Sequence, residues 1–209
     1  MASTTAPTYP PGGTFFDTLK ASFVNVPMDA DHDNAISTTE FLEAAESLTT
    51  LFDVLGSVAF TPVKSDMLGN IKKIRDRQLA APADSTTLQA LVTNEIKAKK
   101  HTAAEGLLWL VRGLDFTALA LRQNVASSSE ELSVSFRSAY TSTLKPHHSF
   151  MVKPIFSAAM SATPYRRDFY AKLGADLPTV ESALRLWLAA LETQVAVLKG
   201  FLDRKEAKW

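Results

Sequence analysis

The sequence predicts an all-α protein of about eight helices in a single domain, and three observations support this fold class. Apolar residues recur at helical spacing along nearly the whole chain, and no run alternates as a strand would. Helix-start pairs, glycines and prolines separate these periodic stretches. No internal repeat or inter-domain linker divides the 209 residues, which suffice for one large core.

The first half of the chain contains four predicted helices. Ser37 and Glu40 have the spacing of a capping box, and Gly56 supplies a helix stop. The first helix is short and amphipathic, starts at Phe15 and ends before Pro27, and the second runs from Ser37 to Gly56. A loop at Phe60-Thr61-Pro62 leads to the third, which runs through Asp66 to about Leu79. The fourth starts at Asp84.

The second half continues the pattern. Thr102 and Glu105 form another capping-box pair, and Pro146 is expected to break or kink a helix. A long apolar helix runs from Thr102 through Leu121. After the Ser127–Ser129 loop, a helix runs to about Lys145 and resumes after Pro146 as far as Pro164. A short helix from Tyr165 to Gly174 and a last one from Pro178 through Leu202 follow.

Composition excludes several classes of function. Hydrophobic residues make up 46% and charged residues 21%, and the 22 basic and 22 acidic residues cancel, so nothing favours nucleic acid. The absence of cysteine excludes disulfides and thiol chemistry, and no apolar run is long enough to span a bilayer. Residues 1–13 are rich in Thr, Pro and Gly without a signal pattern, which predicts a disordered tail and, by default, a cytosolic protein.

Three polar residues stand out in the predicted helix through Asp66. Asp66, Asn70 and Lys73 are spaced i, i+4 and i+7, which places them within about 40–60° on one helix face. An acceptor, an amide and a cation in one row suit a ligand with many hydroxyls better than a metal. On spacing alone, an ordinary solvated stripe is also possible. Likewise, Trp109 by itself fits a core tryptophan, and His147-His148 fits a plain helix start.

These residues belong to three longer motifs. The first is Phe60-Thr61-Pro62-Val63-Lys64-Ser65-Asp66-x-x-Gly69-Asn70-Ile71-x-Lys73-Ile74, and the second is Leu108-Trp109-Leu110-x-Arg112-Gly113-Leu114-x-Phe116. The third is His148-x-Phe150-x-Val152-x-x-Ile155-Phe156-x-Ala158-Ala159, followed by Pro164-Tyr165-x-x-Asp168-Phe169. From about Phe15 to Trp209 the chain resembles the glycolipid transfer protein family. Within this family, its sequence is most similar to the fungal heterokaryon-incompatibility branch.

The resemblance implies a two-layer helical sandwich that encloses an apolar lipid chamber, with residues 14–209 as the family domain. It implies a carrier that moves neutral glycosphingolipids between membranes, or alternatively a glycolipid sensor that binds without trafficking. It further implies a monomer without cofactor, metal or nucleic acid that is cytoplasmic and only transiently touches membranes. An enzyme is disfavoured because the sequence has no HExxH motif, phosphate loop or nucleophile elbow.

The resemblance also assigns roles to the headgroup residues. Trp109 would stack on the first sugar, and Asp66 would accept from the ceramide amide and a sugar hydroxyl. Asn70 and Lys73 would bond further hydroxyls, and His148 would donate to the amide carbonyl, whereas the adjacent His147 is interpreted as structural. The sister branch that carries ceramide-1-phosphate has cations in place of Asn70 and Trp109, so these two residues favour a sugar.

Further residues follow from family position. The expected chamber lining, each member of which is also an ordinary core candidate, is Phe52, Val63, Phe116, Leu144, Phe156, Ala159, Met160 and Trp187. Glu105 stands where relatives place an apolar lining residue. The expected membrane-docking residues, which otherwise form a surface cluster without a role, are Phe150, Lys153, Tyr165, Arg166 and Arg167. Phe150 stands where relatives outside the fungal branch have a tryptophan, and Trp209 is expected to fold back against the site region.

Overall fold

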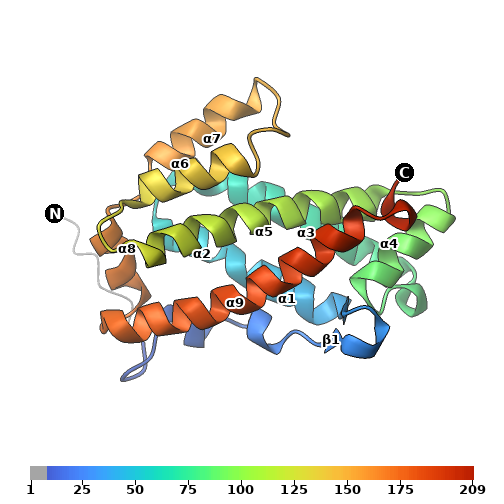
Figure 1. Cartoon of the computed structure of the whole chain (residues 1–209), viewed down its shortest axis with the longest axis horizontal. Coiled ribbons are helices and arrows are strands. Elements are labelled where there is room, and N and C mark those ends of the chain that lie inside the picture. Colours follow the sequence, from blue (N-terminus) through green and yellow to red (C-terminus); the bar gives the residue numbers. More distant parts are fainter. Residues whose placement is uncertain (1–8) are drawn as a thin grey trace.

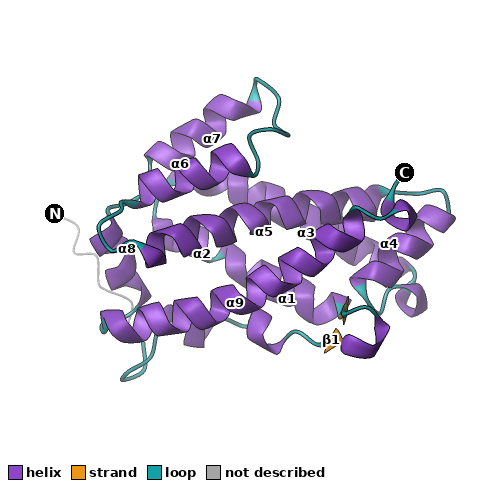
Figure 2. Ribbon diagram, in the orientation of Figure 1, coloured by secondary structure: helices purple, strands orange, loops and turns teal. Residues whose placement is uncertain are grey.

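The computed structural model describes residues 9–209, and in this part of the chain the fold is almost entirely helical, as the sequence predicts (Figures 1 and 2). The α-helices are α1 (Thr38–Thr49), α2 (Leu51–Leu55), α3 (Thr61–Ala80), α4 (Leu88–Lys97), α5 (Thr102–Ala126), α6 (Leu132–Ser142), α7 (Val152–Ser161), α8 (Arg166–Leu173) and α9 (Leu177–Leu202). Short 3₁₀ turns lie at Phe15–Thr18, Phe23–Asn25, Ala30–His32, Val58–Phe60, Pro82–Asp84 and Lys205–Ala207.

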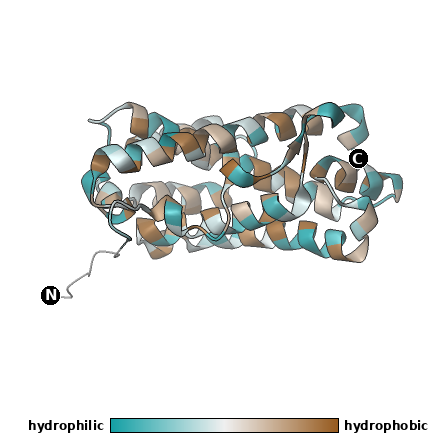
Figure 3. Cartoon of the chain, turned by 90° about the horizontal axis from the view of Figure 1, so that it is seen from below, coloured by the Kyte–Doolittle hydropathy of each residue, from teal (hydrophilic) through white to brown (hydrophobic). Residues whose placement is uncertain are grey.

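The helices pack in two layers, which are visible when the molecule is seen from below (Figure 3). The long helices α3, α5 and α9 lie side by side through the middle, and α5 makes extensive contacts with both neighbours. Buried apolar side chains from every α-helix fill the space between the elements. The α6–α7 pair stands away from the other helices in Figure 1, and α7 packs mainly on α6 and on the turn at Val58–Phe60.

The N-terminal segment differs from the prediction. Instead of one amphipathic helix, Phe15–Thr18 and Phe23–Asn25 form two separate 3₁₀ turns, each begun by a side-chain cap. A two-stranded antiparallel pair, β1 (Met28–Asp29) with β2 (Ala35–Ile36), follows. The pair is too short to show an alternating pattern, which explains why the sequence analysis missed it.

The expected tail at 1–13 is only partly described. Residues 1–8 lie outside the described residues. For residues 9–13 the expectation of disorder is wrong, because the hydroxyl of Tyr9 donates to the carbonyl of Lys172 over 2.6 Å and the N–H of Gly13 donates to the carbonyl of Pro10 over 2.7 Å.

Both predicted capping boxes are wrong in detail. The hydroxyl of Ser37 bonds to the side chain of Glu40, not to the backbone of α1. The first N–H groups of α5 are capped from another helix, because the buried carboxylate of Glu95 accepts from Ala103 over 3.0 Å and from Ala104 over 2.8 Å. Such a tertiary cap satisfies the same unpaired donors but has no local sequence signal.

Several helix boundaries also shift. Pro62 lies in the first turn of α3, where its missing N–H costs nothing, so α3 starts before the predicted loop has ended. Helix α4 begins at Leu88 after a Thr87 cap, later than predicted from Asp84. Pro146 lies in a connecting segment, residues 143–151, and therefore breaks the helix instead of kinking it. The end of α8 at Gly174 and the start of α9 near Pro178 confirm the prediction.

Candidate functional site

The polar residues singled out on α3 form a hydrogen-bonded row. Asn70 donates from Nδ2 to the carboxylate of Asp66 over 3.3 Å, and Lys73 donates from Nζ to Oδ1 of Asn70 over 3.4 Å. Asn70 is buried, whereas Asp66 is open to solvent. Desolvation raises the pKa of Asp66 above its ordinary value, and the charge of Lys73 opposes this shift. The row therefore presents an acceptor, an amide and a cation along about 10 Å of one helix.

Two glycines let α5 approach this row closely. A Cβ atom at Gly106 would lie 3.1 Å from Cβ of Lys73 and 3.2 Å from the carbonyl oxygen of Asn70. A Cβ atom at Gly113 would lie 3.5 Å from the side chain of Met67. Gly106 is thus required for the spacing between the two helices at the level of the polar row, and neither position shows a local sequence reason for glycine.

Trp109 lies between these glycines on the same face of α5, at positions i+3 and i−4, and therefore next to α3. The indole is half-buried. Its ring stacks with the imidazole of His148 at a centroid distance of 5.9 Å and an interplanar angle of 21°. His148 in turn lies 4.4 Å from the ring of Phe156, a buried residue of α7. The polar site and the apolar interior therefore meet at His148.

The environment of His148 favours the neutral form of its imidazole. Desolvation, followed by the nearby charges of His147, Lys153 and Arg112, lowers the pKa of His148. The hydroxyl of Tyr140 lies 3.3 Å from its Nδ1. When Tyr140 donates to Nδ1, Nε2 carries the proton and is free to donate to a ligand carbonyl oxygen. The structure thus brings His148 to Trp109, although His148 lies in the connecting segment and not on a helix as expected.

Sequence reasoning missed two neighbours of this site. Tyr140 reaches His148 only because the turn around Pro146 folds the chain back, which has no pattern along the sequence. The guanidinium of Arg112 lies 4.7 Å from the centroid of the Trp109 ring, a cation–π contact at i+3 on α5. Arg112 is part of the second sequence motif, and its i+3 spacing from Trp109 was the available signal.

The eight expected chamber residues are all buried, and each is at most 7% exposed. Phe52, Phe60, Phe136 and Phe116 form a contiguous chain of aromatic contacts, with centroid distances of 5.8–6.3 Å. Trp187 packs elsewhere, against Phe16 and Phe23. Burial of this kind agrees with a chamber wall and equally with a plain core, so the lining remains a prediction.

Four of the five expected docking residues are accessible: Phe150 (81% exposed), Tyr165 (74%), Arg167 and the half-buried Lys153. Met151 and Ile155, which the sequence analysis did not single out, are also exposed, at 70% and 48%. Phe150 faces outward because it lies in the exposed connecting segment, and not because of the helical phase that the sequence suggested.

The assignment of Arg166 to membrane docking is wrong. Arg166 is 8% exposed, and its side chain donates to Glu181 over 3.0 Å and lies 4.2 Å from the centroid of the Tyr170 ring. A buried, paired guanidinium cannot meet a membrane surface without breaking this arrangement. Burial raises the pKa of Tyr170 to about 12, which keeps the phenol protonated beside the arginine.

Glu105 lies in the first turn of α5, and Trp209 packs beside the same end of this helix. Glu105 is exposed, so its carboxylate does not enter the interior. Trp209 folds back onto α5, where its ring stacks on His101 at 5.7 Å and 7°, and it lines a small pocket with Leu108. Within the described residues, no group of three or more His, Asp or Glu could hold a metal ion, and no helix is long and apolar enough to cross a bilayer.

The fold and the site together define an all-α protein with a polar and aromatic surface site that opens beside an apolar interior. The family model of the glycolipid transfer protein (GLTP) matches residues 36–175, which is more than half of the chain. The chain is 71% identical over 201 residues to a glycolipid transfer protein of Aureobasidium melanogenum, with 96% of this chain and 98% of the relative covered. This protein therefore belongs to the glycolipid transfer protein family.

Solved structures agree. The crystal structure of HET-C2, a fungal glycolipid transfer protein, superposes with a TM-score of 0.92 at 66% identity and covers 94% of this chain and 100% of that chain. The GLTP-fold structure of FAPP2 superposes with a TM-score of 0.82 at 32% identity over 91% of this chain and 95% of that chain. These matches confirm the predicted family and the all-α fold.

Proposed function

We propose that this protein extracts glycosphingolipids from one membrane and delivers them to another. The sugar headgroup binds at Asp66, Asn70, Lys73 and Trp109, and the ceramide chains enter the apolar interior. The observation that carries this proposal is the meeting of the two environments at His148, whose ring contacts both Trp109 and Phe156. The similarity of the chain to the Aureobasidium glycolipid transfer protein and to HET-C2, a fungal glycolipid transfer protein, supports it.

The headgroup chemistry follows from the residues. The indole of Trp109 offers sugar C–H groups the π-face opposite the guanidinium of Arg112, and Asp66 accepts from a hydroxyl and from the ceramide amide. Asn70 and Lys73 bond further hydroxyls, Lys73 with a charge-assisted donor. His148 donates from Nε2 to the amide carbonyl. Because Asn70 and Trp109 carry no charge, a simple neutral sugar fits this site better than a phosphate attached directly to ceramide. The similar protein FAPP2 selects simple glycosphingolipids with the same fold, which supports this assignment.

The apolar interior has an energetic task. Transfer from water to an apolar site is worth about 0.8 kcal/mol per methylene, so a chain of about sixteen methylenes resists aqueous exposure by roughly 13 kcal/mol. The carrier must replace the bilayer with its own lining, for which the eight buried residues from Phe52 to Trp187 named above are the candidates. Helices can separate slightly for this without losing backbone hydrogen bonds, since these bonds lie within each helix.

Membrane contact would occur through the exposed surface around α7. We assign this contact to Phe150, Met151 and Ile155 of the α7 region and to Tyr165, with Lys153 and Arg167 attracting anionic lipid. The protein would be a cytoplasmic monomer that touches membranes transiently and performs no covalent chemistry on its ligand.

A vesicle-to-vesicle transfer assay with galactosylceramide, glucosylceramide, lactosylceramide and ceramide-1-phosphate tests the proposal. We expect fast transfer of the neutral monoglycosylceramides and little transfer of ceramide-1-phosphate. Equal transfer of the phosphorylated lipid would contradict the headgroup assignment. Binding of glycolipid without any acceleration of its transfer would instead identify a sensor, and release of free sugar or ceramide would identify an enzyme.

A further inference from the structure

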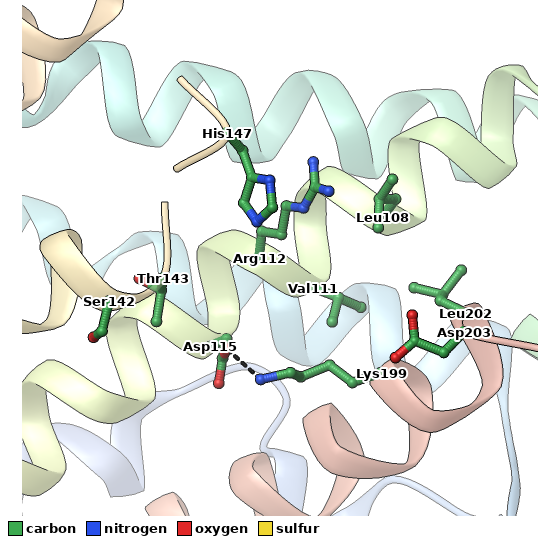
Figure 4. A pocket seen from close by; sticks show the side chains of 10 residues that line it. All are labelled: Leu108, Val111, Arg112, Asp115, Ser142, Thr143, His147, Lys199, Leu202 and Asp203. Atoms are coloured by element: carbon green, nitrogen blue, oxygen red, sulfur yellow. Dashed lines mark hydrogen bonds and ion pairs between the residues drawn. The ribbon is translucent and has the colours of Figure 1, made fainter. Parts of the chain in front are cut away.

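A second polar groove lies beside the candidate headgroup site, on the side of α5 that faces α9. It has a volume of about 260 Å³. Three apolar side chains line it, Leu108, Val111 and Leu202, together with polar groups from α5, the end of α6, the connecting segment 143–151 and the end of α9 (Figure 4). The polar groups that matter below are Arg112, Asp115, His147, Lys199 and Asp203.

The charges in this groove are unevenly distributed. Asp115 and Lys199 form an ion pair at 2.6 Å, and Asp203 lies 3.5 Å from Nζ of Lys208. Both carboxylates therefore have lysine partners. Arg112 makes no ion pair or hydrogen bond within the described residues, and its main contact is the face of Trp109. Among the charged side chains that line the groove, Arg112 is therefore the one without an ion-pair partner in residues 9–209.

His147 lies at the same end as this cation. Figure 4 shows the imidazole of His147 beside the side chain of Arg112, with the Asp115–Lys199 pair and Asp203 at the other end. Desolvation and then the charge of Arg112 lower the pKa of His147, which agrees with their proximity. A neutral imidazole still offers one N–H donor.

From this arrangement we propose that Arg112 and His147 form an oxyanion-binding site that takes a sulfate or phosphate group at the Trp109 end of the groove. A guanidinium presents several donors in a planar fork that matches such oxyanions. The apolar residues Leu108 and Val111 exclude water from one wall, which strengthens the charge-assisted bonds. A half-buried guanidinium without a counter-ion is costly, and the cation–π contact with Trp109 offsets only part of this cost.

The oxyanion can come from two sources. One is a sulfate ester on the sugar of a carried glycolipid, since Arg112 contacts the very ring on which that sugar would stack. The other is a free inorganic ion. The site itself is independent of the proposed function, and only the lipid source rests on it.

The first experiment titrates the whole protein with sodium sulfate at constant ionic strength, balanced by sodium chloride, and follows the indole N–H of Trp109 by NMR. We expect a saturable shift that weakens at least fivefold in Arg112→Gln, which keeps a planar group without the charge, and that weakens also in His147→Ala. The matched control is Arg122→Gln, ten residues and about 15 Å further along α5, where the guanidinium is paired with Glu192 at 2.7 Å. An unchanged response in Arg112→Gln, or no response in the parent, would overturn the site.

The second experiment identifies the source by measuring the ratio of transfer rates for sulfated and unsulfated galactosylceramide. A fall in this ratio of at least threefold in Arg112→Gln, but not in Arg122→Gln, assigns the oxyanion to the carried sugar. An unchanged ratio, together with sulfate binding that depends on Arg112, assigns the site to a free ion. Absence of transfer for both lipids in the parent would defeat the proposed function and leave the sulfate titration as the test of the site.

Discussion

The α3–α5 side of the candidate site and the α6–α7 side are held in different ways. On the first side, Gly106 brings two long helices close together, and Asn70 is buried and bonded to both of its polar neighbours. On the second side, His148 and Phe150 lie in an irregular segment between two short helices, and large apolar side chains there are exposed.

This difference suggests a division of labour. Recognition of a headgroup requires donors and acceptors at fixed positions, which closely packed helices provide. Contact with a bilayer and admission of a lipid chain require a surface that can rearrange at low cost, which sparsely packed segments provide. His148 belongs to the second side but contacts the first, so it couples the two.

The largest expected effect is the loss of headgroup recognition on the α3–α5 side alone. Asp66→Val should nearly abolish binding of a short-chain glucosylceramide, because each ligand donor left without an acceptor costs about 1–3 kcal/mol. The fold should persist, since Asp66 is exposed and its carboxylate makes a single weak hydrogen bond within residues 9–209, to Asn70. Isothermal titration with a matched measurement of thermal unfolding checks this. Parent-like affinity in the variant would remove Asp66 from the site.

A somewhat smaller effect should show whether Trp109 stacks on the sugar or only packs in the core. Trp109→Ala should lose most transfer activity while keeping its helical circular dichroism, and Trp109→Phe should retain part of the activity because a phenyl ring still offers a π-face. If the Ala variant loses activity only in proportion to a large drop in thermal stability, Trp109 is a core residue.

The close approach of α3 and α5 gives a third prediction. Gly106→Val should destabilise the fold by about 1–3 kcal/mol, because the new side chain meets Lys73 and the backbone of Asn70 at distances that real contacts rarely reach. It should also weaken headgroup binding by displacing the polar row. Gly69→Val, where nothing lies within 4 Å of the added Cβ, is the matched control in denaturant unfolding, because it makes the same change in helix propensity without the clash.

His148, which couples the two sides, should make the stability of the fold depend on pH. Burial and neighbouring cations lower the pKa of His148 in the folded protein, so below the ordinary value of about 6.5 the unfolded chain binds more protons than the folded one. Stability should therefore fall as the pH drops from about 7 towards 5, and His148→Gln should reduce this fall in thermal unfolding curves. Asp66, whose pKa is raised, acts in the opposite direction at lower pH, around its own pKa. An identical pH profile in the variant would contradict the altered environment of His148.

The sequence predicted the helical parts well and the irregular parts less well. The polar row at Asp66, Asn70 and Lys73 was predictable because helical spacing alone places the three residues on one face. The bond between Tyr140 and His148 was not, because a loop of unknown path brings them together. Arg166 was misassigned for a similar reason: its partner Glu181 lies on another helix, so the ion pair has no local sequence signal.

The most direct test of the division of labour compares Phe150→Ala with Asp66→Val in two assays, partitioning to glycolipid-free vesicles and affinity for short-chain glucosylceramide in solution. Phe150→Ala should lower partitioning and slow transfer while leaving solution affinity and stability near those of the parent, because its ring is 81% exposed. Asp66→Val should lose solution affinity and keep partitioning. Loss of solution affinity in Phe150→Ala, or a stability cost of several kcal/mol as expected for a core phenylalanine, would contradict the separation of recognition from membrane docking.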